Sequence, residues 1–229
     1  MVDAVLFEFD GVIADTRTAR CRALLDSLEH DGVTLNESEY LEHCAAMPVR
    51  ASIRAAFALR QLAADETAIE LAALRAERRF ATLVETGLSL AVGASALIES
   101  LHGQTRLGIV SRISRRDIEA TLAIAFLDHA FEFVIAQDDA YQPKPSPAPY
   151  VAALERLARR RTVTARNVIA LEDGPVGIRS AKSAGLRCAV VGALPVHLAV
   201  DADALIPSLV AQTVASLDAI TTSAHAAER

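Results

Sequence analysis

Residues 4–11 read Ala-Val-Leu-Phe-Glu-Phe-Asp-Gly, a short apolar run that ends at an acidic residue and a glycine. Such a run before a turn signal predicts a buried strand and the turn that follows it. Similar runs recur at Leu107–Val110, Phe133–Ala136, Val168–Leu171 and Cys188–Val191. Helical patterns separate or follow them at Arg115–Ala125, Pro149–Arg160, Gly177–Ala184 and Ser208–Ile220. This alternation predicts an α/β fold, a doubly wound, Rossmann-like parallel sheet with helices on both faces.

The stretch from Arg17 to Leu88 breaks this rhythm. It is rich in Ala, Leu, Glu and Arg, contains two glycines and one proline, and shows no strand pattern. It predicts several amphipathic helices inserted after the first strand. We therefore expect a core domain of residues 1–16 and 89–229, interrupted by a helical domain of residues 17–88.

Composition excludes several classes of protein. The chain has 229 residues, of which 52% are hydrophobic, enough for a sizeable core and too apolar for a disordered protein. A net charge of −6 argues against a general nucleic-acid or anionic-membrane surface. No apolar run approaches the roughly 20 residues that span a bilayer. Three widely spaced cysteines and a start unlike a signal peptide favour a soluble, cytoplasmic protein.

The predicted strands end in polar side chains. Glu8 and Asp10, Ser111, Asp138 and Asp139, and Glu172 and Asp173 each follow or end one of these strands. In open α/β sheets, ligands bind outside the carboxyl ends of the strands. Carboxylates and a hydroxyl gathered at that edge point to a site for a cation and an oxyanion.

Four ordered segments resemble the motifs of one enzyme family, the haloacid-dehalogenase-like hydrolases. Phe7-Glu8-Phe9-Asp10-Gly11-Val12 resembles the opening motif, and Ile109-Val110-Ser111 the second-strand Ser/Thr motif. Lys144-Pro145-Ser146-Pro147 resembles the lysine motif, and Leu171-Glu172-Asp173-Gly174-Pro175-Val176-Gly177-Ile178 the acidic motif. The resemblance covers essentially the whole chain and is strongest to the β-phosphoglucomutase and phosphoglycolate-phosphatase branch. It implies that the inserted helices form a cap domain.

The resemblance also implies roles for individual residues. Residue 8 would be the carboxylate nucleophile, Asp10 the general acid and base, and Ser111 the hydroxyl that holds a phosphoryl oxygen. Lys144 would balance the charge of the transferring phosphoryl group, with its ammonium within reach of Glu8. A Mg²⁺ cofactor would be held by Glu8, Glu172, Asp173 and the backbone carbonyl of Asp10.

Each motif alone has a plainer interpretation. Asp10-Gly11 is a common turn, and Glu172-Asp173-Gly174 is typical of a helix N-cap. Lys144 alone would be a solvated loop residue. However, only two of the 23 basic residues are lysines, and Lys144 lies in a segment that holds four of the eight prolines. The four motifs in the family's order favour the family over an unrelated doubly wound binding module.

Glu8 departs from the family pattern, which has Asp at the nucleophile position. The extra methylene shifts the carboxylate by about 1 Å, and a misplacement of that size can cost roughly 10²-fold in rate. Glutamate carboxylates do act as nucleophiles in other enzymes. Two hypotheses follow: a Mg²⁺-dependent phosphatase or phosphomutase, or a catalytically impaired protein that binds Mg²⁺ and phosphate in a regulatory role.

Two arginines are candidates for substrate binding. Arg112 follows Ser111, where its guanidinium could clamp a phosphate or carboxylate or could pair with Asp117. Arg50, in the inserted helices, matches loosely a cap arginine that contacts the substrate's distal anion in the phosphomutase-like branch, or lies on a solvated helix face. We expect a small phosphorylated substrate, no nucleic-acid or membrane partner, and a monomer or small homo-oligomer. Phosphatase and mutase activity stay equally open.

Overall fold

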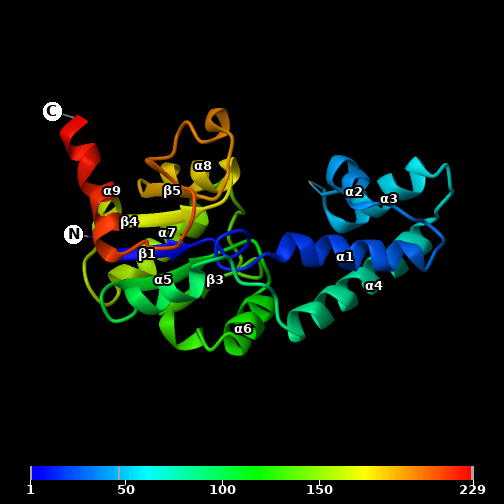
Figure 1. Cartoon of the computed structure of the whole chain (residues 1–229), viewed down its shortest axis with the longest axis horizontal. Coiled ribbons are helices and arrows are strands. Elements are labelled where there is room, and N and C mark those ends of the chain that lie inside the picture. Colours follow the sequence, from blue (N-terminus) through cyan, green and yellow to red (C-terminus); the bar gives the residue numbers. More distant parts are fainter. Residues whose placement is uncertain (1, 46, 228–229) are drawn as a thin grey trace. The chain divides into compact units, whose positions relative to one another are not determined.

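The predicted strands form one parallel sheet in the computed structural model, which describes residues 2–45 and 47–227 (Figure 1). In this part of the chain the sheet has six strands in the order β3-β2-β1-β4-β5-β6. The strands are β1 (Ala4–Phe7), β2 (Arg106–Val110), β3 (Phe133–Ile135), β4 (Val168–Glu172), β5 (Arg187–Val191) and β6 (Ala204–Ile206). The predicted doubly wound parallel sheet is confirmed, and β6 adds an edge strand that the sequence pattern did not indicate.

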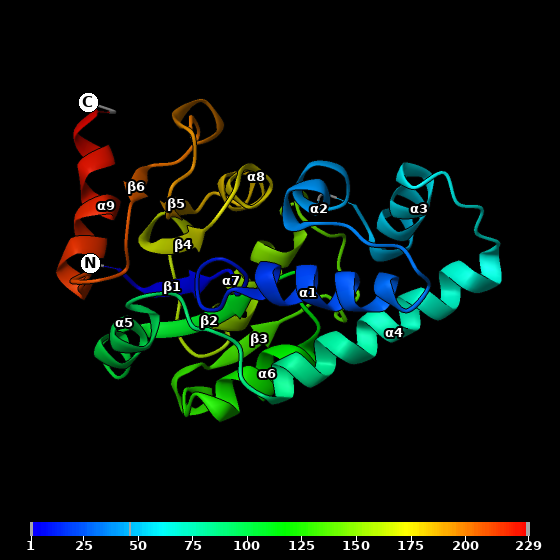
Figure 2. The same ribbon diagram turned by 45° about the vertical axis from the view of Figure 1, so that its right-hand side comes forward.

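Helices flank the sheet and bury its strands on both faces (Figures 1 and 2). Alternate residues of β1, β4 and β5, including Leu6, Ala170 and Cys188, share a core with the helices α7 and α8. The helix α9 contacts β4 and β5. The helices of this unit are α5 (Ala94–Leu101), α6 (Arg115–Ile124), α7 (Ala148–Ala158), α8 (Pro175–Ser183) and α9 (Val214–Ala227). Burial on both faces explains why the strands appear as continuous apolar runs rather than as alternating patterns.

The register of the strands determines where the polar side chains meet. Phe7 at the end of β1 pairs with Ile109 of β2 on one side and with Leu171 of β4 on the other. The next residue along each strand, Glu8, Val110 and Glu172, therefore lies at the same level of the carboxyl edge. This level is at the boundary between β1 and β4, where the strand order of the sheet reverses and where α/β proteins bind ligands.

Residues Thr16–Leu88 form a second compact unit made of helices, and the residues up to Asp15 and from Ser89 onward form the first. The helices are α1 (Thr16–Glu29), α2 (Glu37–His43), α3 (Val49–Leu59) and α4 (Glu66–Glu85). Their apolar faces meet in a core that includes Leu28, Ile53 and Ile69. Asn36 and Asp65 cap the amino ends of α2 and α4 through their side chains, which satisfies backbone N–H groups there.

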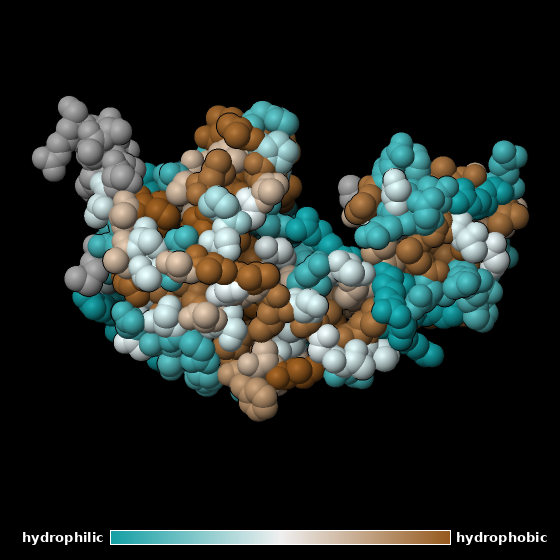
Figure 3. Space-filling model, in the orientation of Figure 1, coloured by the Kyte–Doolittle hydropathy of each residue, from teal (hydrophilic) through white to brown (hydrophobic). Residues whose placement is uncertain are grey.

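The described helices are all too short or too polar to cross a membrane. On the face shown in Figure 3, hydrophilic side chains cover much of the helical unit, and apolar side chains show between its helices. This pattern agrees with amphipathic helices that turn their apolar faces inward.

Candidate active site

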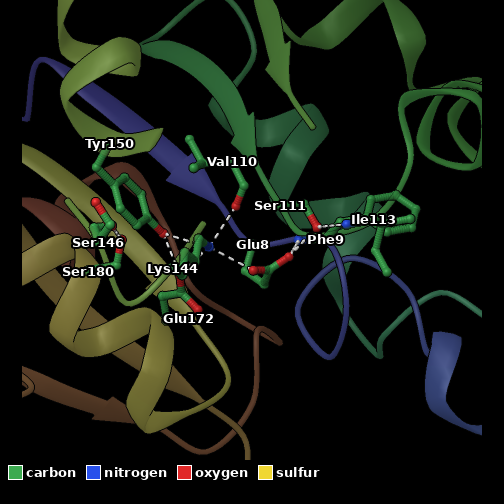
Figure 4. A network of polar contacts seen from close by, with 10 residues as sticks. All are labelled: Glu8, Phe9, Val110, Ser111, Ile113, Lys144, Ser146, Tyr150, Glu172 and Ser180. Atoms are coloured by element: carbon green, nitrogen blue, oxygen red, sulfur yellow. Dashed lines mark hydrogen bonds and ion pairs between the residues drawn. The ribbon is translucent and has the colours of Figure 1, made fainter. Parts of the chain in front are cut away.

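Glu8 follows β1 directly and is buried, with 4% of its surface exposed. Its Oε1 accepts hydrogen bonds from the backbone amide of Phe9, at 2.8 Å, and from the hydroxyl of Ser111. Its Oε2 lies 2.7 Å from Nζ of Lys144 (Figure 4). Both carboxylate oxygens of Glu8 are therefore engaged by donors of the protein itself.

Lys144 brings the separate motifs together. Its ammonium donates to Glu8 Oε2, to Glu172 Oε1 at 2.6 Å and to the carbonyl of Val110 at 2.8 Å. These three acceptors use all the protons of an ammonium group. Burial alone would lower the pKa of Lys144, but the adjacent carboxylates of Glu172 and Glu8 outweigh it and raise the pKa above its ordinary value. Lys144 thus remains charged although it is buried.

The loop that carries Lys144 is held by the neighbouring helix. Ser180 in α8 donates its hydroxyl to the carbonyl of Ser146 at 2.6 Å, two residues after the lysine (Figure 4). The prolines on both sides of Ser146 restrict the backbone further. This fixed loop places a long, flexible side chain at one position in the site.

Glu172 ends β4 and is almost completely buried, with 1% of its surface exposed. Its Oε1 accepts hydrogen bonds from Lys144 and from the hydroxyl of Tyr150. Its carboxylate also lies against Gly177 in α8, where a Cβ would come within 1.8 Å of Oε2, so only glycine fits there. Burial raises the pKa of Glu172 to about 7, although Lys144 acts in the opposite direction.

Asp10 and Asp173 lie beside this network and are each partly exposed. Between them, Gly11 adopts a left-handed backbone conformation with φ of 76°. A Cβ at Gly11 would lie 2.7 Å from Oδ2 of Asp173, so the carboxylate packs directly on the turn after Asp10. The Asp10-Gly11 pair therefore has two effects: its glycine allows the turn, and the missing Cβ leaves space for Asp173.

The carboxylate of Asp173 and the backbone carbonyl of Asp10 are the oxygen ligands whose chemistry fits a magnesium ion. Mg²⁺ binds oxygen ligands, and proteins often supply one or two carboxylates while water and substrate phosphate supply the rest. The carboxylates of Glu8 and Glu172 are instead bound to Lys144. Among the described residues no group of three or more His, Cys, Asp or Glu side chains is arranged to hold a metal. The four-residue set remains a prediction, and Asp173 with the backbone carbonyl of Asp10 is its best-fitting part.

The two candidate arginines lie in different units. Arg112 is exposed next to Ser111. Asp117, the alternative partner predicted for Arg112, accepts a hydrogen bond from the hydroxyl of Ser114 at 2.7 Å. Arg50 lies on α3, where its Nε and Nη2 each donate to Glu70 of α4 at 2.7 Å. A contact of either arginine with substrate stays a prediction.

Tyr150 is the main site residue to which the sequence analysis gave no role. It lies six residues after Lys144, in the first turn of α7, and its side chain is completely buried. Its hydroxyl donates to Glu172, and Nζ of Lys144 lies 4.9 Å from the centre of its ring. A buried tyrosine normally needs a hydrogen-bond partner for its hydroxyl. That rule could have linked it to the carboxylates at the neighbouring strand ends.

Comparison with known proteins gives a consistent result. The sequence model of the haloacid dehalogenase-like hydrolase family matches residues 5–191. Protein CbbY of Cereibacter sphaeroides is 32% identical over 199 residues, which cover 83% of this chain and 84% of that protein. The phosphoglycolate phosphatase of Rhodospirillum rubrum is 27% identical over 196 residues, or 83% of this chain and 80% of that protein.

Solved structures show the same relationship. The crystal structure of CbbY from Rhodobacter sphaeroides in complex with phosphate superimposes with a TM-score of 0.76 at 30% identity, over 95% of this chain and 100% of that one. A β-phosphoglucomutase from Clostridium difficile shares the fold with a TM-score of 0.74 at 18% identity, over 99% of this chain and 100% of that one.

Proposed function

The chain belongs to the haloacid dehalogenase-like hydrolase family, and we propose that it transfers the phosphoryl group of a small phosphorylated metabolite through the carboxylate of residue 8. The observation that carries this proposal is the meeting of Glu8, Ser111, Lys144 and Glu172 at one edge of the sheet. Two ion pairs of 2.7 and 2.6 Å, both to Lys144, connect three of the four family motifs there. The comparisons support the reaction class, because several relatives are phosphatases by name.

In the proposed reaction, an oxygen of Glu8 attacks the phosphorus atom and the bond from phosphorus to the leaving oxygen breaks. Asp10 gives a proton to that leaving oxygen and later takes a proton from the water that hydrolyses the acyl phosphate. Ser111 and Lys144 hold phosphoryl oxygens and balance their charge. Hydrolysis returns Glu8 as a carboxylate and releases inorganic phosphate. If a sugar hydroxyl replaces water, the same residues carry out a mutase reaction.

Magnesium is part of this proposal. The carboxylate of Asp173 and the backbone carbonyl of Asp10 would hold the ion, and Glu172 would assist through a bound water. When bound, Mg²⁺ supplies positive charge to the phosphoryl oxygens. Arg112, exposed beside Ser111, would bind the remainder of the substrate, and Arg50 would contact its distal anion.

A second function, binding without efficient turnover, is favoured by one specific observation. Both oxygens of Glu8 accept hydrogen bonds from Phe9, Ser111 and Lys144, whereas an attacking oxygen needs a lone pair directed at phosphorus. The longer side chain lets the Glu8 carboxylate take the donors that a phosphoryl oxygen would use. A substrate must then exchange these contacts, which slows or prevents the attack.

The substitution Glu8→Asp decides between the two functions. The shorter side chain withdraws the carboxylate from Ser111 and Lys144 and restores the family's attack distance. We expect hydrolysis of an aryl phosphate or a sugar phosphate to rise about 10²-fold over wild type. The measurement is kcat/KM with Mg²⁺ and with a chelator, over a panel that includes phosphoglycolate.

Two variants serve as controls. Glu172→Asp makes the same chemical change at the neighbouring carboxylate and should lower the rate. Asp173→Ala should abolish Mg²⁺ binding by calorimetry and with it the gain of Glu8→Asp. A fall in rate in Glu8→Asp would show that the site has adapted to glutamate. If neither wild type nor Glu8→Asp hydrolyses any substrate of the panel while both still bind Mg²⁺, only the binding function remains.

A further inference from the structure

A polar cavity lies at the opposite end of the strands from Glu8. It has a volume of about 200 Å³ and is lined by Arg166, Lys182, Gly185, Leu186 and Arg187. Arg187 begins β5 and pairs with Ile169, three residues before the level of Glu172. Three residues of strand span about 10 Å. The cavity is therefore separate from the site at the carboxyl edge.

Arg187 is the unusual residue of this cavity. Its side chain is nine-tenths buried, and its Nη1 donates to Oδ1 of Asp203 at 3.0 Å. Its Nε and Nη2 are also buried but have no hydrogen-bond partner among the described residues. A buried donor without an acceptor is costly, and such groups are rare in folded proteins.

The unpartnered edge of Arg187 is the edge with which other arginines of this chain bind carboxylates. Arg50 uses Nε and Nη2 for both oxygens of Glu70, each at 2.7 Å. Arg106 uses the same two nitrogens for Glu132, at 2.8 and 2.7 Å. The Nε–H and Nη2–H groups on this edge form a fork of two parallel donors, which matches two oxygens of a carboxylate or phosphate. In Arg187 the same fork binds no acidic side chain of the part of the chain that the structure describes.

The charged side chains that line the cavity are cationic, which favours an anion. Its lining contains three cationic side chains and no acidic one. The carboxylate that touches two of them, Asp203, is already engaged by Lys182 at 2.6 Å, by Arg187 and by the amide of Cys188 at 2.8 Å. The chain as a whole carries a charge of −6, so the cavity does not follow the general charge of the protein.

We propose that this cavity binds a small oxyanion, the phosphate or carboxylate group of a metabolite, through Arg166, Lys182 and Arg187. Arg166 is exposed and the side chain of Lys182 is 30% exposed, so these two cations meet the anion first. Arg187 also lines the cavity, and its buried, unpartnered Nε and Nη2 would supply donors to the bound oxygens. The proposal is independent of phosphoryl transfer at Glu8.

The test is titration of the full chain with inorganic phosphate and, separately, with citrate, followed by calorimetry at low salt and at 0.15 M salt. We expect Arg166→Gln and Lys182→Gln each to weaken binding about tenfold. Arg166 is exposed, so its variant should fold normally even if Lys182→Gln, which removes one of the three donors to Asp203, does not. Arg179→Gln removes an exposed cation from the same helix as Lys182 but outside the cavity, and should leave the affinity unchanged.

A second readout observes the fork directly. In ¹⁵N-labelled protein the Nε–H resonance of Arg187, identified by its loss in Arg187→Lys, should move when the anion binds. It should move less in Arg166→Gln at the same subsaturating concentration. The probe that binds more tightly, phosphate or citrate, shows whether the cavity prefers a phosphate or a carboxylate group. Equal affinity in wild type and both cavity variants, or an equal loss in Arg179→Gln, would overturn the proposal. None of the three glutamine variants should change the rate at which a phosphorylated substrate is hydrolysed at Glu8.

Discussion

Two regions of the molecule contain ion pairs of nearly equal length in opposite surroundings. In the core, Lys144 lies 2.7 Å from Glu8, and their side chains are 2% and 6% exposed. In the helical unit, Arg50 lies 2.7 Å from Glu70, and their side chains are 56% and 48% exposed. Distance alone does not distinguish these pairs. The difference is that water can replace a lost partner at the surface and cannot do so in the core.

This comparison predicts that breaking a polar contact lowers the free energy of unfolding more when the contact is more deeply buried. The largest effect should come from Lys144→Met, which leaves the carboxylates of Glu8 and Glu172 facing each other without a cation. Removing one partner of a buried pair costs about 3–5 kcal/mol. Urea denaturation of wild type and variant measures the loss in the free energy of unfolding.

Two controls sharpen this first prediction. Arg54→Met removes a cation of similar length from an exposed pair with Glu66, and its unfolding curve should coincide with that of wild type. Adding Glu8→Gln to Lys144→Met removes one of the unpaired charges and should recover part of the loss. If Lys144→Met were as stable as Arg54→Met, burial would not be the variable that matters.

Tyr150→Phe should give the next largest effect. The ring stays in the core, but Glu172 loses the hydrogen bond from the tyrosine hydroxyl. A hydrogen bond to a charged group contributes about 2 kcal/mol. Thermal and urea unfolding measure this loss. The control is Tyr141→Phe, because Tyr141 is 40% exposed and its hydroxyl can bond to water. Equal losses in the two variants would contradict the prediction.

The same difference in burial explains how much of the fold the sequence could predict. Strands β1, β2, β4 and β5 are buried on both faces and appear as uninterrupted apolar runs. The edge strand β6 is three residues long, and Leu205 at its centre is 48% exposed, so it leaves no such pattern. The last helix begins at Val214 rather than near Ser208. The amide of Val210 donates to the hydroxyl of Ser208, and the hydroxyl of Thr213 accepts the amide of Ser216 at the amino end of the helix. Local polar contacts of this kind carry no periodic signal.

The candidate site was predictable to a similar degree. Motif order brought Glu8, Ser111, Lys144 and Glu172 together, because parallel strands end at one edge. The role of Tyr150 and the saturation of both Glu8 oxygens depend on side-chain geometry, which residue spacing does not determine. Arg187 gave no sequence signal, since an arginine that opens a strand is ordinary until its partners are known.

The pair of Asp203 with Lys182 is intermediate in burial between the core pair and the surface pair. Changing the pH tests how much the charge of Asp203 stabilises the fold. Burial raises its pKa, but the hydrogen bonds from Lys182, the Cys188 amide and Arg187 outweigh this and lower the pKa below its ordinary value. The unfolded chain, with an ordinary Asp pKa of about 3.9, then binds a proton more readily than the folded one. The stabilisation is therefore present above about pH 4 and is lost as pH falls through the folded pKa.

We expect wild type to exceed Asp203→Asn by about 1 kcal/mol in urea unfolding at pH 6. The difference should shrink steadily as the pH is lowered below 4. Asp201→Asn, two residues earlier and exposed, should show no such dependence. A difference between wild type and Asp203→Asn that stays constant down to pH 2 would mean that Asp203 acts through packing and not through charge.

The smallest effect is expected at Arg50 and Glu70, which are half exposed and joined by two hydrogen bonds of 2.7 Å. A double-mutant cycle with Arg50→Gln and Glu70→Gln should give a coupling free energy of unfolding at the limit of measurement, and added salt should remove it.

A surface pair that does not stabilise the fold leaves Arg50 available for substrate binding. If Arg50 contacts the distal anion of the substrate, Arg50→Gln raises KM for a bisphosphorylated substrate without changing the urea midpoint. Arg54→Gln, one helical turn away and paired with Glu66, should leave both unchanged. A shift of the urea midpoint in Arg50→Gln as large as that in Tyr150→Phe would contradict the rule that burial, and not distance, sets the cost.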